Sequence, residues 1–246
     1  MSGLKETHIT IVGAGRVGQN FAKSAPHHSL IRRGDSLSDL PKGPIVLCTR
    51  NDDLEGIVDS IQKERHCDLI FVQNGMIEHF LGSRDLLDTT QALLYIAIGK
   101  IGDQAVDGEK TVVVGKWSEL FCDLMSVCGL KCQSVDRKNY RVQMAEKFLW
   151  IASFGVLCDV HGKSVGDVAQ EHRSDVDALS EELRGVVARN AGIQIPTGLC
   201  QRLCLYSESI PNYRASVKEW SWRNGWLWER EQSPLHASFL NILGRA

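Results

Sequence analysis

Three patterns are absent from the sequence, and each absence excludes a class of function. No stretch approaches the roughly 20 apolar residues that span a bilayer, so we expect no membrane. No run of Lys and Arg occurs and the formal net charge is −2, so we expect no nucleic acid among the partners. No C-x-x-C pair occurs, which removes the strong zinc signatures, and we expect no metal.

The chain passes almost at once into a strand-like run, which leaves no room for a signal peptide. We therefore expect a cytoplasmic protein. Its eight cysteines are more than usual, and we interpret them as reduced core residues, because free Cys packs as a small hydrophobe. A cytosolic protein of this size does not need disulfides.

The first half of the chain alternates between short apolar runs and helical segments, which is typical of a parallel sheet covered by helices. Two later stretches, "ALLYIAIGKIG" and "KTVVVG", favour antiparallel or mixed strands at the sheet edge. The sequence predicts strands at residues 8–12, 29–31, 44–48, 67–72 and 130–135, and helices at 17–24, 52–62 and 118–128.

From about residue 139 the strand signal fades. The segment "YRVQMAEKFLWIASFGVLCDVHG" is mostly apolar on all sides, which indicates a buried helix, and residues 175–191 form an amphipathic one. We predict an α/β fold with a Rossmann-like domain over residues 1–136, followed by an all-α domain over residues 137–246.

The stretch "THITIVGAGRVGQNF" places G-x-G-x-x-G between a predicted strand and a predicted helix. Gly13 permits the tight turn, Gly15 lets the backbone approach a pyrophosphate, and Gly18 lets helix and strand pack closely. The pyrophosphate would rest on backbone N–H groups at the helix start, where Arg16 and Val17 follow. A glycine-rich turn without a ligand is the alternative.

Arginines follow the second and third predicted strands. A site for NAD would normally place an acidic side chain after the second strand, but Arg32 and Arg33 stand there, and a guanidinium suits the 2′-phosphate of NADP(H). Arg50 is a candidate second clamp on that phosphate. We therefore predict NADP(H). Asp35 as a ribose ligand, and the arginines as solvated surface charges, remain alternatives.

Three further stretches resemble the ketopantoate reductase family, in the same order along the chain: "FVQNGM", "EKFLWIASFGVLCDVHGKSVGDV" and "SESIPNYRASVKEWSWRNG". With "GAGRVG" and "RRGDSL", the resemblance covers nearly the whole chain. It implies a Rossmann-like domain, a C-terminal domain like that of 6-phosphogluconate dehydrogenase, and NADPH-dependent reduction of a small 2-oxo acid. Ketopantoate, the pantothenate precursor, is the default substrate, and a homodimer is the candidate assembly.

The resemblance also implies roles for individual residues. Asn74 corresponds to the asparagine near nicotinamide and substrate, Lys147 to the general acid, and Glu219 to the carboxylate that binds the substrate hydroxyl and helps place the lysine. Ser207 corresponds to a contact of the substrate carboxylate, with Ser209 as an alternative. A hydride that reaches a ketone carbon leaves negative charge on oxygen, to which an ammonium can donate a proton.

The sequence departs from the family after the lysine, where Ile151 and Gly155 stand in place of asparagines that contact the substrate. The departure keeps two alternatives open: a non-catalytic NADPH-binding regulator, and a dehydrogenase for a different 2-oxo or imino acid. Without a functional role, Lys147 would be a lysine that extends from a buried helix to the surface, and Glu219 would be a surface charge.

The tryptophans of "EWSWRNGWLWE" lack a clean helical spacing, so we favour core packing or a subunit contact for them. His161 ends the predicted buried helix, and we favour a structural role for it.

Overall fold

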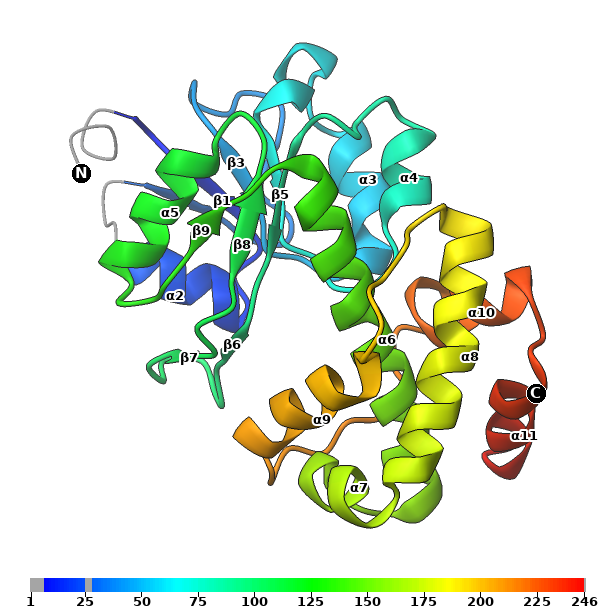
Figure 1. Cartoon of the computed structure of the whole chain (residues 1–246). Coiled ribbons are helices and arrows are strands. Elements are labelled where there is room, and N and C mark those ends of the chain that lie inside the picture. The colour runs from blue at the N-terminus through cyan, green and yellow to red at the C-terminus, as the bar shows by residue number, and fades with distance from the viewer. Residues whose placement is uncertain (1–6, 25–27, 246) are drawn as a thin grey trace. The chain divides into compact units, whose positions relative to one another are not determined.

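The structure is a computed structural model that describes residues 7–24 and 28–245. The chain divides into two compact units, Met1–Tyr140 and Arg141–Ala246 (Figure 1). The predicted boundary at residue 136 falls just before α6 (Arg137–His161), the helix in which the division lies. Among the described residues, no helix combines the length and the apolar character that a bilayer crossing requires.

Within its described residues, the first unit contains a seven-stranded sheet in the order β2-β1-β3-β4-β5-β8-β9. Strands β2, β1, β3, β4 and β5 are parallel, whereas β8 runs antiparallel to β5 and pairs in parallel with β9. The predicted parallel sheet with a mixed edge is therefore confirmed. The strands are β1 (Thr10–Val12), β2 (Ser29–Ile31), β3 (Ile45–Leu47), β4 (Leu69–Phe71), β5 (Thr90–Leu93), β8 (Val112–Val114) and β9 (Gln133–Ser134), beside a separate ribbon of β6 (Ile96–Ala97) and β7 (Val106–Asp107).

Helices cover both faces of this sheet, because alternate strand residues point to opposite faces and both sets are apolar (Figure 1). On one face the ring of Phe21 meets that of Phe121 edge-to-face, with centroids 5.9 Å apart, and joins the buried Ile11 and Val46 in one core. Helices α2 (Arg16–Ser24) and α5 (Ser118–Val127) pack on this face, and α3 (Leu54–Asp59) and α4 (Glu78–Gly82) lie on the other.

The helix predicted over residues 52–62 is interrupted. A 3-10 turn η1 (Asn51–Asp53) precedes α3, and a second one, η2 (Lys63–Asp68), follows after a break at Ser60. The Ser60 hydroxyl donates to the Gly56 carbonyl at 2.6 Å, and its backbone N–H is shared between the carbonyls of Gly56 and Ile57. Such side-chain and bifurcated bonds at the helix end favour termination over continuation.

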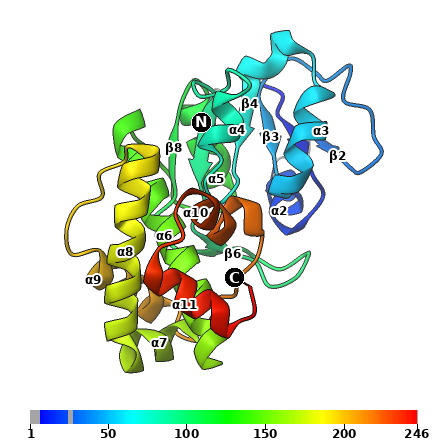
Figure 2. The ribbon, with the colours of Figure 1, turned by 90° about the vertical axis from the view of Figure 1, so that its right-hand side faces the viewer.

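The second unit is all-helical, as predicted, and its long apolar segment forms the buried part of α6. Helix α8 packs against α7, α9, α10 and α11 (Figure 2). It ends at Gly192, whose φ of 65° is the left-handed conformation that favours glycine. The helices are α7 (Val165–Glu171), α8 (Arg173–Ala191), α9 (Leu199–Ser209), α10 (Asn224–Arg230) and α11 (Pro234–Ile242), with a 3-10 turn η3 (Trp220–Trp222).

All eight cysteines are free thiols, as predicted. Cys158, Cys200 and Cys204 are buried in the second unit, whereas Cys67 is exposed, so the interpretation of every cysteine as a core residue is wrong for Cys67. Cys67 lies in η2, a turn at the surface that contributes no buried residue.

Candidate active site

The glycine-rich loop leads from β1 into α2, and two of its glycines are required by the fold itself. Gly13 has a φ of 106°, and a Cβ there would lie 2.7 Å from the Cys48 carbonyl oxygen. A Cβ on Gly18 would lie 1.8 Å from the Gly13 carbonyl oxygen. Gly15 differs, because a Cβ there would meet no atom within 4 Å. The protein leaves open space beside Gly15, where a bound pyrophosphate would approach.

Helix α2 begins at Arg16, so the first backbone N–H groups of this helix have no partner within it. They form the positive end of the helix dipole, which attracts anions. The Arg16 side chain is engaged elsewhere, since its Nη1 donates to the carbonyls of Ile98 at 2.9 Å and Gly99 at 3.3 Å. The contributions predicted for Arg16 and Val17 would therefore come from their backbones.

The residues that follow β1, β2, β3 and β4 share one edge of the sheet, because these strands are parallel. Val12 pairs with Ile31 on one side and with Leu47 on the other, and Leu47 pairs with Phe71. Gly13, Arg32, Arg33, Arg50 and Asn74 each follow one of these strand ends. The predicted cofactor residues of the first unit thus lie at the edge where open α/β sheets bind their ligands.

All three of the arginines at this edge are exposed. The carboxylate of Asp35 accepts the backbone N–H of Arg32 at 2.7 Å and closes a local turn. Arg33 Nη2 lies 3.6 Å from Asp53 Oδ2, with side chains 91% and 42% exposed, so this pair is a weak surface contact. The guanidinium groups are consequently available to a phosphate, although Asp53 would compete for Arg33.

The loop after β4 is fixed by two side chains that the sequence did not single out. Gln73 Nε2 donates to the Leu47 carbonyl at 2.7 Å, and Asn51 Nδ2 donates to the Asn74 carbonyl at 2.8 Å. The Asn74 Oδ1 atom is buried and has no hydrogen-bond partner among the described residues. A buried acceptor without a partner is costly, so this oxygen is poised to accept a hydrogen bond from a ligand.

In the second unit, Lys147 projects from α6 and is only 7% exposed. Burial, together with a smaller contribution from the nearby positive charge of Arg223, lowers the pKa of its ammonium group from 10.5 to about 7. A lysine with such a pKa carries a transferable proton near neutral pH, as a general acid requires.

Glu219 forms an ion pair with Arg223, and both side chains are largely buried. Glu219 has φ 47° and ψ 56°, a left-handed conformation that a non-glycine residue seldom adopts. Such backbone strain persists only where surrounding contacts enforce it, and it concentrates at functional sites. The motifs of the sequence pointed to Glu219 but not to Arg223, which only the structure shows to be the ion-pair partner of Glu219.

The Asn-Gly pair after Arg223 has a packing role. Asn224 Nδ2 lies 3.2 Å from the Ala152 carbonyl of α6, to which it donates, and 3.1 Å from Nε2 of the buried His236. A Cβ on Gly225 would lie 2.5 Å from Nε1 of Trp220, so only glycine fits beneath that ring. The start of α10, and Arg223 with it, is thereby held against α6.

One of the four tryptophans, Trp226, is buried and meets the ring of Phe148 edge-to-face at 5.6 Å, which confirms core packing for that residue. Trp220, Trp222 and Trp228 are half-buried.

The hydroxyl of Ser207 is fully buried. It accepts a hydrogen bond from Trp150 Nε1 at 2.9 Å and donates one to the Leu203 carbonyl at 3.0 Å. Its predicted contact with a substrate would have to displace one of these bonds. Ser209 is exposed and donates to the Tyr206 carbonyl at 2.6 Å.

The two departures after Lys147 have different surroundings. Ile151 is half-buried one helical turn after Lys147. Gly155 is buried, and a Cβ there would lie 3.1 Å from the Ser216 carbonyl oxygen. The segment that leads to Glu219 therefore packs closely on α6 at position 155, and a side chain there would have to displace it slightly.

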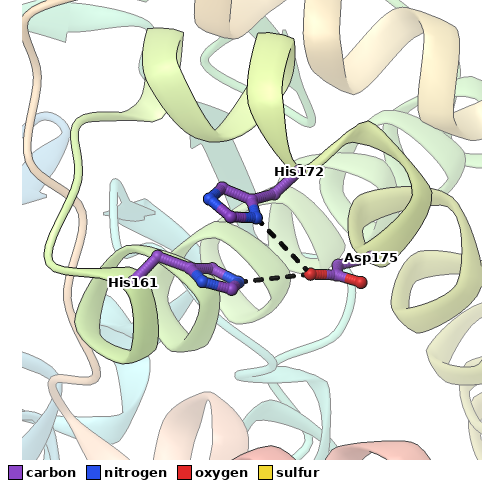
Figure 3. Close-up of side chains that lie close together, drawn as sticks. All are labelled: His161, His172 and Asp175. Atoms are coloured by element: carbon purple, nitrogen blue, oxygen red, sulfur yellow. Dashed lines mark ion pairs between the residues drawn. The ribbon is translucent and has the colours of Figure 1, made fainter.

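His161, His172 and Asp175 form a group of potential metal ligands at the ends of α6 and α7 and the start of α8 (Figure 3). Asp175 Oδ2 lies 3.2 Å from His161 Nε2 and 3.8 Å from His172 Nδ1. The two rings stack nearly in parallel, with centroids 3.6 Å apart and an interplanar angle of 13°. A metal ion binds in the plane of each imidazole, and two parallel stacked planes do not meet at one point, so this arrangement suits a contact at a helix start better than a metal centre.

Comparison with family models and with curated proteins finds no match to this sequence. Solved structures match nearly the whole chain. They include 2-dehydropantoate 2-reductase from Methylococcus capsulatus (15% identity, TM-score 0.72, 96% of each chain covered) and a dimeric ketopantoate reductase from Staphylococcus aureus (16% identity, TM-score 0.70, 96% of this chain and 97% of the other). D-mandelate dehydrogenase in complex with NADH matches at 15% identity and a TM-score of 0.69, over 96% of this chain and 97% of the other.

These similarities define the fold. It is the two-part fold of an N-terminal Rossmann-like unit followed by a helical unit, which the sequence predicted. More particularly, it is the fold of the ketopantoate reductases, so the resemblance found in the motifs extends to the three-dimensional structure of the chain.

Proposed function

We propose that this protein is an NADPH-dependent reductase of a small 2-oxo acid, with ketopantoate as the default substrate. The observation that carries the proposal is the buried Lys147, whose pKa of about 7 suits it to donate a proton, on a fold shared with ketopantoate reductases. The similarity to D-mandelate dehydrogenase, another enzyme of this fold, supports reduction of a 2-oxo acid in general.

The first unit fits the cofactor. The pyrophosphate would rest on the start of α2 beside Gly15, where the fold leaves open space. Arg32 and Arg33 would bind the 2′-phosphate, and Arg50 would assist them. The buried Asn74 Oδ1 would accept a hydrogen bond near the nicotinamide. Because the D-mandelate dehydrogenase structure contains NADH, NADH is the competing cofactor for this chain.

A bound reduced nicotinamide supplies the hydride for the carbonyl carbon of the substrate. Lys147 donates its Nζ proton to the carbonyl oxygen, so that a 2-hydroxy acid forms, and the neutral amine regains a proton from solvent. Glu219 accepts a hydrogen bond from the new hydroxyl. Burial of Lys147 favours the transfer, because the ammonium form is not strongly stabilised by water.

Lys147→Met tests this role, because methionine keeps an unbranched apolar chain but has no proton to give. We expect a loss of about 10²–10⁴-fold in turnover, measured as NADPH oxidation with ketopantoate and a panel of smaller and larger 2-oxo acids. NADPH affinity should stay unchanged, since the predicted phosphate contacts belong to the first unit. Wild-type turnover of another acid would keep the mechanism and replace the substrate.

A non-catalytic NADPH-binding regulator is the second candidate. Ile151 and Gly155 favour it, since neither offers a polar group to a substrate. Tight NADPH binding without turnover of any 2-oxo acid would favour this candidate and exclude a reductase of 2-oxo acids. The Staphylococcus aureus enzyme is described as dimeric, and a homodimer is our proposal for this chain, to be tested by light scattering.

A further inference from the structure

Arg223 interacts with two other charged residues of the second unit: it forms an ion pair with Glu219, and its positive charge acts on the ammonium group of Lys147. The guanidinium of Arg223 stays charged at every relevant pH, and Glu219 is the carboxylate with which it forms an ion pair. Protonated Lys147 adds a second positive charge. The group therefore has an excess positive charge in a largely buried place, which suits an anionic ligand.

Arg223 has donors that the protein does not use. Its Nη2 engages Glu219, whereas its Nε is buried and has no hydrogen-bond partner among the described residues. A guanidinium presents five N–H donors in a planar fork that matches the two oxygens of a carboxylate. The buried Nε–H is therefore a donor that a ligand could use.

The backbone on both sides holds Arg223 in place. Its N–H donates to the Trp220 carbonyl at 3.0 Å, and the next residue, Asn224, is anchored to the Ala152 carbonyl of α6. Ala152 lies five residues after Lys147 on the same helix. With a side chain only 15% exposed, Arg223 is a fixed part of the Lys147 surroundings, unlike a solvated surface arginine.

The sequence lacks the asparagines that the resemblance would place on α6 to contact the substrate, so another polar group would have to bind it. Positions 151 and 155, where the resemblance would place asparagines, hold isoleucine and glycine, and the Ser216 carbonyl lies close to position 155. Ser207 is occupied by internal hydrogen bonds. Arg223 is a strong polar donor close to Lys147 that these departures leave in place.

We propose that Arg223 binds the carboxylate of the 2-oxo acid and thereby sets the specificity for a substrate with a carboxylate next to its ketone. This inference rests on the proposed reductase function. Arg223 replaces the amide contacts that Ile151 and Gly155 do not supply, while Lys147 faces the ketone oxygen. The 2-oxo acids are accordingly preferred over their uncharged amides and esters.

The test compares wild type, Arg223→Met and Arg223→Lys on each 2-oxo acid and on its amide. We expect Arg223→Met to raise KM for the acid by about 10–100-fold, because a charge-assisted contact is lost, and to leave KM for the amide unchanged. Arg223→Lys should recover part of the loss. Arg230→Met is the matched control, since Arg230 ends α10, the helix that begins directly after Arg223, is exposed and stacks on Trp226 at 4.2 Å.

The pH profile gives a second readout, which shows whether the charge of Arg223 acts on Lys147 during turnover. Removal of a neighbouring positive charge should shift the basic limb of kcat/KM to higher pH in Arg223→Met and leave it in place in Arg223→Lys. Equal losses on acid and amide, whether or not the pH limb moves, would overturn the inference and make Arg223 a structural clamp for Glu219.

Failure of the proposed function would look different. If wild type turned over no 2-oxo acid, calorimetric titration with oxamate in the presence of NADP⁺ would still test the site. Oxamate binding that Arg223→Met abolishes would support Arg223 as a carboxylate ligand without catalysis, whereas absence of binding to wild type would refute both proposals. If Arg223→Met failed to fold, as judged by circular dichroism, Arg223→Gln would replace it in every comparison.

Discussion

The open space beside Gly15 leads to a sharp prediction about Gly15→Ala. A methyl group there would meet no protein atom within 4 Å, and the residue does not have the positive φ that would make alanine strained. Compared with glycine, alanine reduces the conformational entropy of the unfolded chain, which stabilises the folded protein by about 0.4–1 kcal/mol at a compatible position. Gly15 also directly precedes α2, where alanine is a poorer N-cap than glycine by a similar amount. The two effects offset, so the free energy of unfolding should change by less than about 1 kcal/mol.

Cofactor binding should change far more. The new methyl group would occupy the space through which a pyrophosphate reaches the backbone N–H groups of α2. Loss of one charge-assisted hydrogen bond costs about 1.5–3 kcal/mol, so NADPH affinity should fall by about 10–150-fold. Fluorescence titration with NADPH gives the affinity, and urea unfolding gives the stability.

Two glycines serve as controls. Gly56→Ala makes the same chemical change in an exposed position of α3 with no atom within 4 Å, and it should leave NADPH affinity unchanged. Gly18→Ala should destabilise the protein strongly, because its Cβ would lie 1.8 Å from the Gly13 carbonyl oxygen. If Gly15→Ala bound NADPH as tightly as wild type, the loop would be a turn without a ligand.

Three further predictions concern the cofactor, the core and the departures from the family. Arg33→Ala should weaken NADPH binding more than tenfold and NADH binding little, whereas Asp53→Asn should tighten NADPH binding by releasing Arg33, both by titration. Burial lowers the pKa of His236 to about 4, so the imidazole is neutral in the folded protein and takes up a proton on unfolding below about pH 6.5. The free energy of unfolding should therefore fall by up to about 3 kcal/mol between pH 6.5 and 4. Urea unfolding of His236→Gln should lack this pH-dependent loss. Gly155→Asn should cost about 1–3 kcal/mol and lower turnover, because its Cβ would press on the backbone before Glu219; higher turnover would contradict the packing argument.

The sequence predicted those parts of the fold that repeat a simple pattern. Strands β1, β2, β3 and β4 were found because each is an apolar run bounded by turn residues; β2 has the predicted bounds, and the other three are shorter than predicted by one or two residues at an end. The ribbon of β6 and β7 was not resolved from the sheet, because its two short strands lack a distinct pattern. The interruption near Ser60 depends on individual hydrogen bonds, which periodicity does not report.

The candidate site was predictable only where a motif carried it. Gly15 and Lys147 lie in stretches that resemble a family; the fold leaves open space beside Gly15 and buries Lys147, and the roles of both residues stay predictions. Arg223 was not predicted, because a single arginine between tryptophans matches no functional motif. Its proposed role depends on the ion pair with Glu219 and on the buried Nε–H, which only the folded structure reveals. Ser207 was predicted from its motif, but the motif does not show that its hydroxyl is buried and hydrogen-bonded to Trp150.

The most direct test of the central claim follows the hydride itself. The protein would be supplied with NADPH deuterated at C4 of the nicotinamide, on either face in separate reactions, together with ketopantoate and the panel of 2-oxo acids. We predict that one of the two labelled cofactors delivers deuterium to C2 of a 2-hydroxy acid, and that Lys147→Met slows the transfer by about 10²–10⁴-fold. Bound NADPH that yields no labelled 2-hydroxy acid from any of these substrates would contradict it.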